Sequence, residues 1–164
     1  MFEVLVFVYE HYWHGDACPE SRQLGRRLSA HGFEADEIHD ALVWLDGLHL
    51  AAQSTALSGP PAPDSTPPVA AVQSGASMRV YSVAEQGHLG AACLGFISFL
   101  DTSGVLPAAM REIVIERAMA APGGPVSLDD LKIIVLMVYW SFDQEPDALV
   151  LDELCDPAEG RLPH

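Results

Sequence analysis

The amino-acid sequence predicts an all-α protein built of two small helical domains. Apolar residues recur at helical intervals in both halves of the chain, and Ser-x-x-Glu and Ser-x-x-Asp patterns typical of helix starts occur in the second half. A proline-rich stretch separates the halves. We therefore expect a three-helix N-terminal domain over residues 1–50 and a three-to-four-helix C-terminal domain over residues 78–156.

The N-terminal half has the proportions of a helix-turn-helix unit preceded by one further helix. The first helix is expected over residues 2–13, where Glu3 and Glu10 share one face and apolar residues cover the rest. A second helix should open at Pro19 and stop at Gly32, because proline suits a first helical position and glycine a C-terminus. A third helix is predicted over residues 35–48.

Residues 51–77 are predicted to form a flexible linker between the two domains. Asp64 is the only charged residue in this stretch, which has five prolines and no aromatic side chain. Such a composition buries too little apolar surface to offset the entropy lost on ordering. Residues 157–164 are expected to form a frayed tail.

The C-terminal half is expected to begin with residues 78–81, a short extended segment that would suit an edge strand. Helices should follow over residues 82–101, 107–121 and 127–141, the first and third opening with the serine patterns that satisfy free backbone amides. Pro146 would open a last short helix.

The charge balance excludes several classes of partner. The chain has 164 residues, with 23 acidic and 8 basic side chains and a formal charge of −15. Nucleic acids and anionic membranes are bound largely through Lys and Arg, so this balance argues against both. The longest uncharged apolar stretch, Ile133–Phe142, is far shorter than the roughly 20 residues that span a bilayer.

The cysteines and the N-terminus suggest a cytoplasmic protein. Cys18, Cys93 and Cys155 are odd in number, widely spaced and without a CxxC pair, which does not suit a disulfide framework. The first residues lack the basic region and cleavage site of a signal peptide. We therefore expect a reducing cytoplasmic environment.

The sequence offers one weak metal-binding candidate and no catalytic motif. His11, His14 and Cys18 are spaced by three and four residues, as donors on one helix face would be. Gly15 and Pro19 interrupt that helix, so an exposed histidine cluster is the better interpretation. Neither a nucleophile elbow nor a phosphate-binding glycine loop occurs, so no catalytic residue and no cofactor is predicted.

Nucleic acid binding by the helix-turn-helix-like unit is an alternative that the charges disfavour. The second helix has Arg22, Arg26 and Arg27, but the third, which would enter the major groove, has four acidic residues and no basic one. Those carboxylates would face phosphates. A role as an accessory factor in DNA or RNA processing therefore stays as a second hypothesis.

Large aromatic residues and arginines mark the expected partner-binding surface. Tyr12, Trp13 and Trp44 are large side chains for so small a domain, and Arg22 and Arg26 are expected to be exposed. Aromatic and arginine side chains dominate the hot spots of protein interfaces. We expect most of the aromatic rings to lie in the core and any exposed one to be a docking anchor.

The chain resembles the bacterial Smg family in both halves. In the first half the resemblance rests on Met1 to Trp13, Gln23-Leu24, Leu28-Ser29-Ala30, Gly32-Phe33, Glu37-Ile38, Ala41-Leu42 and Trp44-Leu45. In the second half it rests on Arg79-Val80-Tyr81, Glu85, Gly95-Phe96, Leu100, Gly104-Val105-Leu106, Arg111-Glu112, Ile115, Leu131-Lys132 and Val138. The linker departs from the pattern, and asparagine is more usual where His11 stands.

The resemblance implies a helical, bacterial, cytoplasmic protein but no activity, and it transfers no site residue. Smg genes often neighbour DNA-processing genes, which fits the second hypothesis by association. Three functions follow in order: a non-enzymatic adaptor that binds unknown protein partners, an accessory factor on DNA or RNA, and a metal-dependent enzyme using His11, His14 and Cys18. The oligomeric state is left open.

Overall fold

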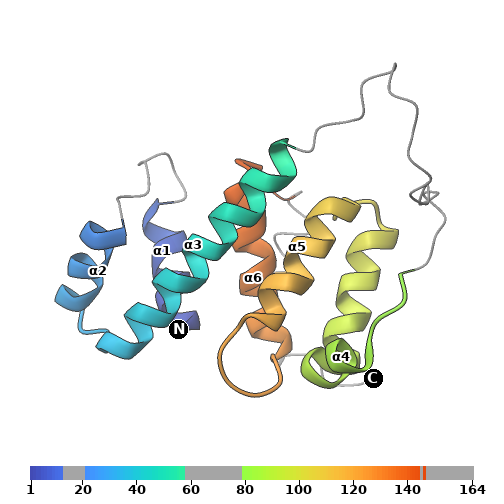
Figure 1. The fold of residues 1–164 in the computed structure, drawn as a ribbon, viewed down its shortest axis with the longest axis horizontal. Helices are drawn as coiled ribbons and strands as arrows, with labels where there is room; N and C mark the ends of the chain where they lie inside the picture. Colours follow the sequence, from blue (N-terminus) through green and yellow to red (C-terminus); the bar gives the residue numbers. More distant parts are fainter. Residues whose placement is uncertain (13–20, 58–78, 145, 147–164) are drawn as a thin grey trace, which may run out of the picture.

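The computed structural model describes residues 1–12, 21–57, 79–144 and 146. Within these residues the chain forms α-helices and no strand, which confirms the predicted all-α class (Figure 1). The helices are α1 (Phe2–Tyr12), α2 (Ser21–Ala30), α3 (Ala35–Leu57), α4 (Val83–Thr102), α5 (Ala108–Met119) and α6 (Leu128–Ser141).

One hydrophobic core joins the two halves of the chain, where the sequence had suggested two separate interiors. α1 packs against α6, and α3 packs against both α5 and α6. The buried residues of all six helices form a single cluster within the described part of the chain. The physical reason is α6, which buries side chains on nearly every side and therefore needs neighbours from both halves.

The third helix is longer than predicted, since α3 continues through residues 51–57. That part of the predicted linker has three alanines, one leucine and one glutamine, which favour helix, whereas the prolines begin only at Pro60. Ala52 is buried, and the hydroxyl of Thr55 donates to the carbonyl of Ala51 at 3.0 Å. The rest of the predicted linker, residues 58–77, lies outside the described residues.

The edge strand predicted at residues 78–81 does not form in the described residues 79–81. A lone extended segment needs a neighbouring strand for its hydrogen bonds, and the described part of the chain is helical around it. Arg79 instead holds the segment by ion pairs with α4 and α5. Residue 78 lies outside the described residues.

α4 begins at the predicted capping box and is interrupted at a glycine. The amide of Glu85 donates to Ser82 Oγ at 3.2 Å, and the amide of Ser82 donates to Glu85 Oε2 at 2.7 Å. Gly90 has φ 68° and ψ 171°, so the helix axis changes direction there, as Figure 1 shows. The carbonyl of His88 accepts the amide of Val126 at 2.9 Å, which ties the loop after α5 to this bend.

α5 and α6 follow the predicted starts. Pro107 is the N-cap residue of α5, and Ser127 Oγ accepts the amide of Asp130 at 3.1 Å at the start of α6. The short helix predicted from Pro146 onwards and the tail at residues 157–164 lie outside the described residues. No described helix is long and apolar enough to cross a membrane.

Candidate interaction surface on α3 and α5

Trp44 fixes α5 against α3. Its indole is 3% exposed, and Nε1 donates to the carbonyl of Arg117 at 2.9 Å. The last carbonyls of a helix lack intrahelical partners, so this bond satisfies one of them near the end of α5. The two helices therefore meet along a defined line between the N-terminal and C-terminal halves of the chain.

Gly47 makes room for the side chain of Arg117 at this contact. A Cβ atom at residue 47 would lie 2.0 Å from Arg117 Nη1 and 3.1 Å from Cζ. The Arg117 guanidinium donates through Nη2 to Glu116 Oε1 at 2.9 Å. Its Nε atom is buried and has no hydrogen-bond partner among the described residues. The Arg117 side chain is thus packed against α3, and its buried Nε–H group is unpaired among the described residues.

Two exposed apolar side chains flank this arginine. Val43 is 58% exposed and Leu50 is 66% exposed. Residues 43, 47 and 50 lie on one face of α3 because their spacing is four and three. We call the surface formed by Val43, Gly47, Leu50 and Arg117 the α3–α5 face.

A pocket of about 180 Å³ lies at one end of the α3–α5 face. It lies where α3 meets the end of α5 and the turn that follows α5. Its lining consists of His39, Asp40, Val43, Trp44, Arg117, Ala120 and Pro122. The pocket thus combines an exposed aliphatic side chain, one indole and opposite charges. Such a lining suits a partner side chain with both polar and apolar parts better than a purely apolar one.

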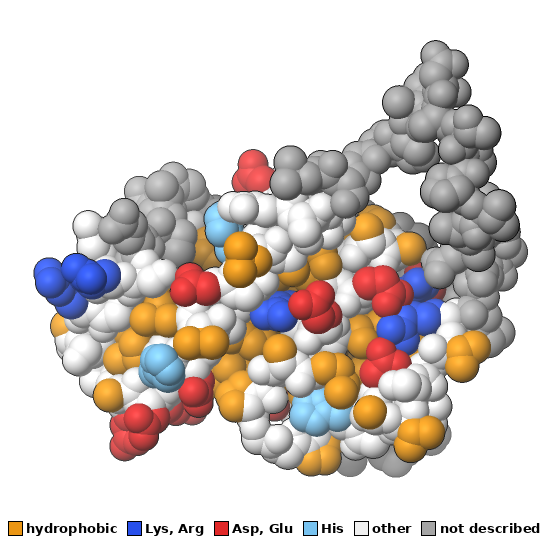
Figure 2. Space-filling view, viewed as in Figure 1, with side chains coloured by type: hydrophobic (Ala, Val, Ile, Leu, Met, Phe, Trp, Pro, Cys, Tyr) orange, Lys and Arg blue, Asp and Glu red, His pale blue; other side chains and the backbone are white. Residues whose placement is uncertain are grey.

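The surroundings of the α3–α5 face are acidic. α3 includes four carboxylates and no Lys or Arg: Asp36, Glu37, Asp40 and Asp46. Figure 2 shows hydrophobic and acidic side chains together over α3. A partner with basic residues around an apolar anchor would complement this face.

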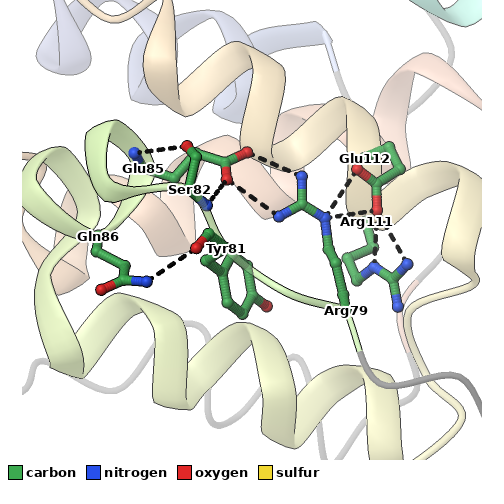
Figure 3. Close-up of polar contacts among 7 residues, drawn as sticks. All are labelled: Arg79, Tyr81, Ser82, Glu85, Gln86, Arg111 and Glu112. Atoms are coloured by element: carbon green, nitrogen blue, oxygen red, sulfur yellow. Dashed lines mark hydrogen bonds and ion pairs between the residues drawn. The ribbon is translucent and has the colours of Figure 1, made fainter.

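A second polar cluster lies where residues 79–82 meet α4 and α5 (Figure 3). Arg79 bridges two carboxylates: Nη2 lies 2.8 Å from Glu85 Oε1, and Nε lies 2.9 Å from Glu112 Oε1. The Arg79 guanidinium also lies 4.8 Å from the centre of the Tyr81 ring. Arg111 adds a further contact to Glu112 at 2.9 Å. We call this cluster the Arg79 clamp.

The electrostatics of the Arg79 clamp are those of a structural contact. The hydrogen bond from Arg79, helped by the amide of Ser82, lowers the pKa of Glu85 from 4.5 to about 2. The same hydrogen bond to Glu85 raises the pKa of Arg79. Each charged group is thereby kept in its ionised form, paired with its neighbour, and unsuited to proton transfer near neutral pH.

The structure places the predicted partner-binding residues in different environments. Tyr12 and Trp44 are buried, at 6% and 3% exposure, so they belong to the core as most of the aromatic rings were expected to. Arg22 and Arg26 are exposed on α2. Trp13 lies outside the described residues.

The predicted metal donors are only partly placed. His11 is exposed at the end of α1, with its ring stacked on Phe7 at a centroid distance of 3.9 Å. His14 and Cys18 lie outside the described residues. In the parts of the chain that are described, no three His, Cys, Asp or Glu side chains are grouped as metal ligands would be.

The α3–α5 face itself was missed by sequence reasoning. The one signal was Gly47, a residue that weakens helices, in the middle of a strongly helical segment. Such a glycine indicates a close approach by another group. Its partner Arg117 is 70 residues away in the sequence, and that pairing is visible only in the folded chain.

Comparison with known proteins identifies the family. A family model described as "Protein of unknown function (DUF494)" matches residues 1–164. The chain is 58% identical over 164 residues to a protein of Leptothrix cholodnii named "Protein Smg homolog", covering all of both chains. The chain belongs to the Smg family. Proteins of the same name from Methylibium petroleiphilum and Bordetella avium are 58% and 48% identical, again over the full lengths.

The family membership confirms the resemblance drawn from the sequence and leaves the activity open, because the family is described as one of unknown function. No solved structure matches the chain. Arg79, Glu85, Arg111 and Glu112, which carried part of the Smg resemblance, meet in the Arg79 clamp. In this part of the chain the resemblance therefore rests on residues that hold the fold together.

Proposed function

We propose that this Smg-family protein is a cytoplasmic, non-enzymatic adaptor that binds a basic segment of another protein on its α3–α5 face. The proposal rests on one observation: Val43 and Leu50 are exposed on the same side of α3, on either side of the Gly47 notch that holds Arg117. Exposed aliphatic side chains in register on a helix are typical anchors for a partner helix.

The charges define the chemistry of the partner. The four carboxylates of α3 lie between residues 36 and 46, and the chain as a whole has a formal charge of −15. An amphipathic helix with aliphatic residues at i and i+4 or i+7 and with Lys or Arg beside them would match both the apolar residues and the carboxylates. The apolar contacts would supply affinity, and the charges would guide encounter and orientation.

The polar groups support an interaction role over a catalytic one. In the Arg79 clamp, acidic and basic side chains neutralise each other at the junction of α4 and α5. In the pocket on the α3–α5 face, Arg117 is drawn towards Glu116 and Trp44 is bonded to a backbone carbonyl. These groups are used in packing, and none is poised as an acid, base or nucleophile by its surroundings.

The test is site-specific photo-crosslinking in the native bacterium. A photoreactive residue replaces His39, which lines the pocket, and in a matched protein it replaces Val83, which is 86% exposed on α4. Amine-reactive crosslinkers suit this protein poorly, since Lys132 is its only lysine and is 5% exposed. The captured segment is then synthesised as a peptide and its affinity measured.

We expect a captured helix with basic and aliphatic residues that binds the wild-type protein and is weakened about tenfold or more by Val43→Gln combined with Leu50→Gln. Val83→Gln, at an even more exposed apolar residue elsewhere, should leave the affinity unchanged. Equal loss in both variants, or capture at residue 83 alone, would refute the α3–α5 face. Tight binding of a labelled DNA duplex at moderate salt would favour the nucleic-acid alternative instead.

A further inference from the structure

Three of the chain's eight Lys and Arg side chains lie on α2, at one end of the molecule. Arg79, Arg111 and Arg117 are each paired with a carboxylate. α2, by contrast, has three arginines and no acidic residue: Arg22, Arg26 and Arg27. Figure 2 shows the resulting basic group at the end of the molecule formed by α2. Among the described residues, no ion pair engages the arginines of α2, so these cationic side chains are available to a ligand.

Beside these arginines, α1 and the end of α2 enclose a pocket of about 260 Å³ lined by Phe7, His11, Tyr12, Arg27 and His31. The rings lie close together. His31 lies 4.6 Å from Phe7 and 6.2 Å from His11, measured between ring centroids. The pocket is therefore walled by aromatic and imidazole rings, with one guanidinium at its edge.

The hydrogen bonds leave donors available in this pocket. Arg27 donates through Nη1 to the hydroxyl of Tyr12 at 3.0 Å, which orients the guanidinium and leaves its other N–H groups for a ligand. His11 Nδ1 lies 2.8 Å from the carbonyl of Phe7, so this nitrogen is the donor, and Nε2 of the neutral ring is then an acceptor. Arginine is the side chain best suited to bind a phosphate through two parallel hydrogen bonds.

We propose that the pocket between α1 and α2 binds a nucleoside monophosphate, as a free nucleotide or as one unit of a single-stranded nucleic acid. Arg27 and His31 hold the phosphate, and the planar base lies against the face of the His11 ring that Phe7 does not cover. Base–aromatic stacking supports such binding without sequence readout. This site is separate from the α3–α5 face and does not depend on the adaptor proposal.

The experiment is a two-dimensional NMR titration of the full-length protein, with the amide and histidine side-chain signals assigned. The probes are adenosine monophosphate, adenosine, inorganic phosphate and a short single-stranded RNA. We expect adenosine monophosphate to shift the signals of Phe7, His11 and His31 and to bind more tightly than adenosine or phosphate alone. RNA that binds still more tightly at the same signals would identify the polymer as the source of the nucleotide.

Variants separate this site from general attraction to positive charge. Arg27→Gln should weaken binding of adenosine monophosphate about tenfold or more, since charged hydrogen bonds are lost. His31→Phe keeps a ring and removes a donor, so it should weaken the nucleotide but not adenosine. Arg22→Gln, an exposed neighbour on α2, is the matched control. Three results would each overturn the proposal: no shift in the signals of the pocket residues, equal binding of adenosine and its monophosphate, or unchanged affinity in Arg27→Gln.

Discussion

At the scale of single residues, glycine and arginine decide how elements that are distant in sequence meet. Gly47 lowers the helix propensity of α3, and its missing side chain leaves room for Arg117 to lie against the helix. Arg79 draws a short extended segment onto two helices through Glu85 and Glu112. In both places a long basic side chain connects elements that are distant in sequence.

The contact between Gly47 and Arg117 is expected to show coupling in a double-mutant cycle. Gly47→Ala should stabilise an Arg117→Ala protein by up to about 1 kcal/mol, because alanine favours helix and nothing opposes its Cβ. In the wild-type background the same change places Cβ 2.0 Å from Arg117 Nη1, so the gain should vanish or reverse. Urea unfolding of the four proteins measures this, and additive effects would contradict the contact.

Glu85 should make stability depend on acid pH. Its pKa is about 2 in the folded protein against an ordinary 4.5, so the unfolded chain takes up the proton first and stability falls as the pH drops from about 5 to about 2. Glu85→Gln should be less stable at pH 7 and lose part of this slope. Unfolding in urea at several pH values tests it, with Glu3→Gln, exposed on α1, as the control that should keep the wild-type slope.

At the scale of elements, the starts of α4 and α6 follow local sequence chemistry. The predicted starts at Ser82 and Ser127 are observed as N-caps, with side-chain oxygens accepting the amides of Glu85 and Asp130. The end of α3 was misjudged because residues 51–57 were assigned to the proline-rich linker. The bend of α4 was also missed, because a glycine inside a helical pattern usually does not interrupt the helix.

Two glycines of α4 should respond oppositely to alanine. Gly90 has φ 68° and ψ 171°, a conformation almost restricted to glycine, so Gly90→Ala should destabilise the protein by about 1–3 kcal/mol. Gly95 lies in the regular part of the same helix with open space around it, so Gly95→Ala should stabilise by about 0.5–1 kcal/mol. Thermal and urea unfolding provide the comparison, and a loss of equal size at both positions would contradict the bend.

At the scale of the whole molecule, α6 makes the two halves one folding unit. It is packed by α1 and α3 from one side of the sequence and by α4 and α5 from the other. We expect a core that is shared in this way to unfold as a whole. The expectation of two domains followed from the linker composition, which says nothing about how the flanking helices pack.

A core substitution in α1 should therefore weaken the far half as well. Leu5 is fully buried, and Leu5→Ala should cost about 2–5 kcal/mol of unfolding free energy. Hydrogen exchange is expected to show that the slowest amides of α4 lose protection by the same free energy as those of α1. Undiminished protection in α4 would instead indicate two independent domains. Val43→Ala, at a 58% exposed position, is the control that should change neither helix.

The sequence by itself determined the helical class, most helix starts, the acidic character and the Smg family. These properties depend on local spacing, capping and composition. Residues close together in the chain determine them without contacts to the rest of the fold. Only the tertiary structure decided that one core joins the halves, that Trp44 and Arg117 meet, and that His31 lies beside His11. Such pairings arise from packing between residues far apart in the chain, which the periodicity of one sequence does not encode.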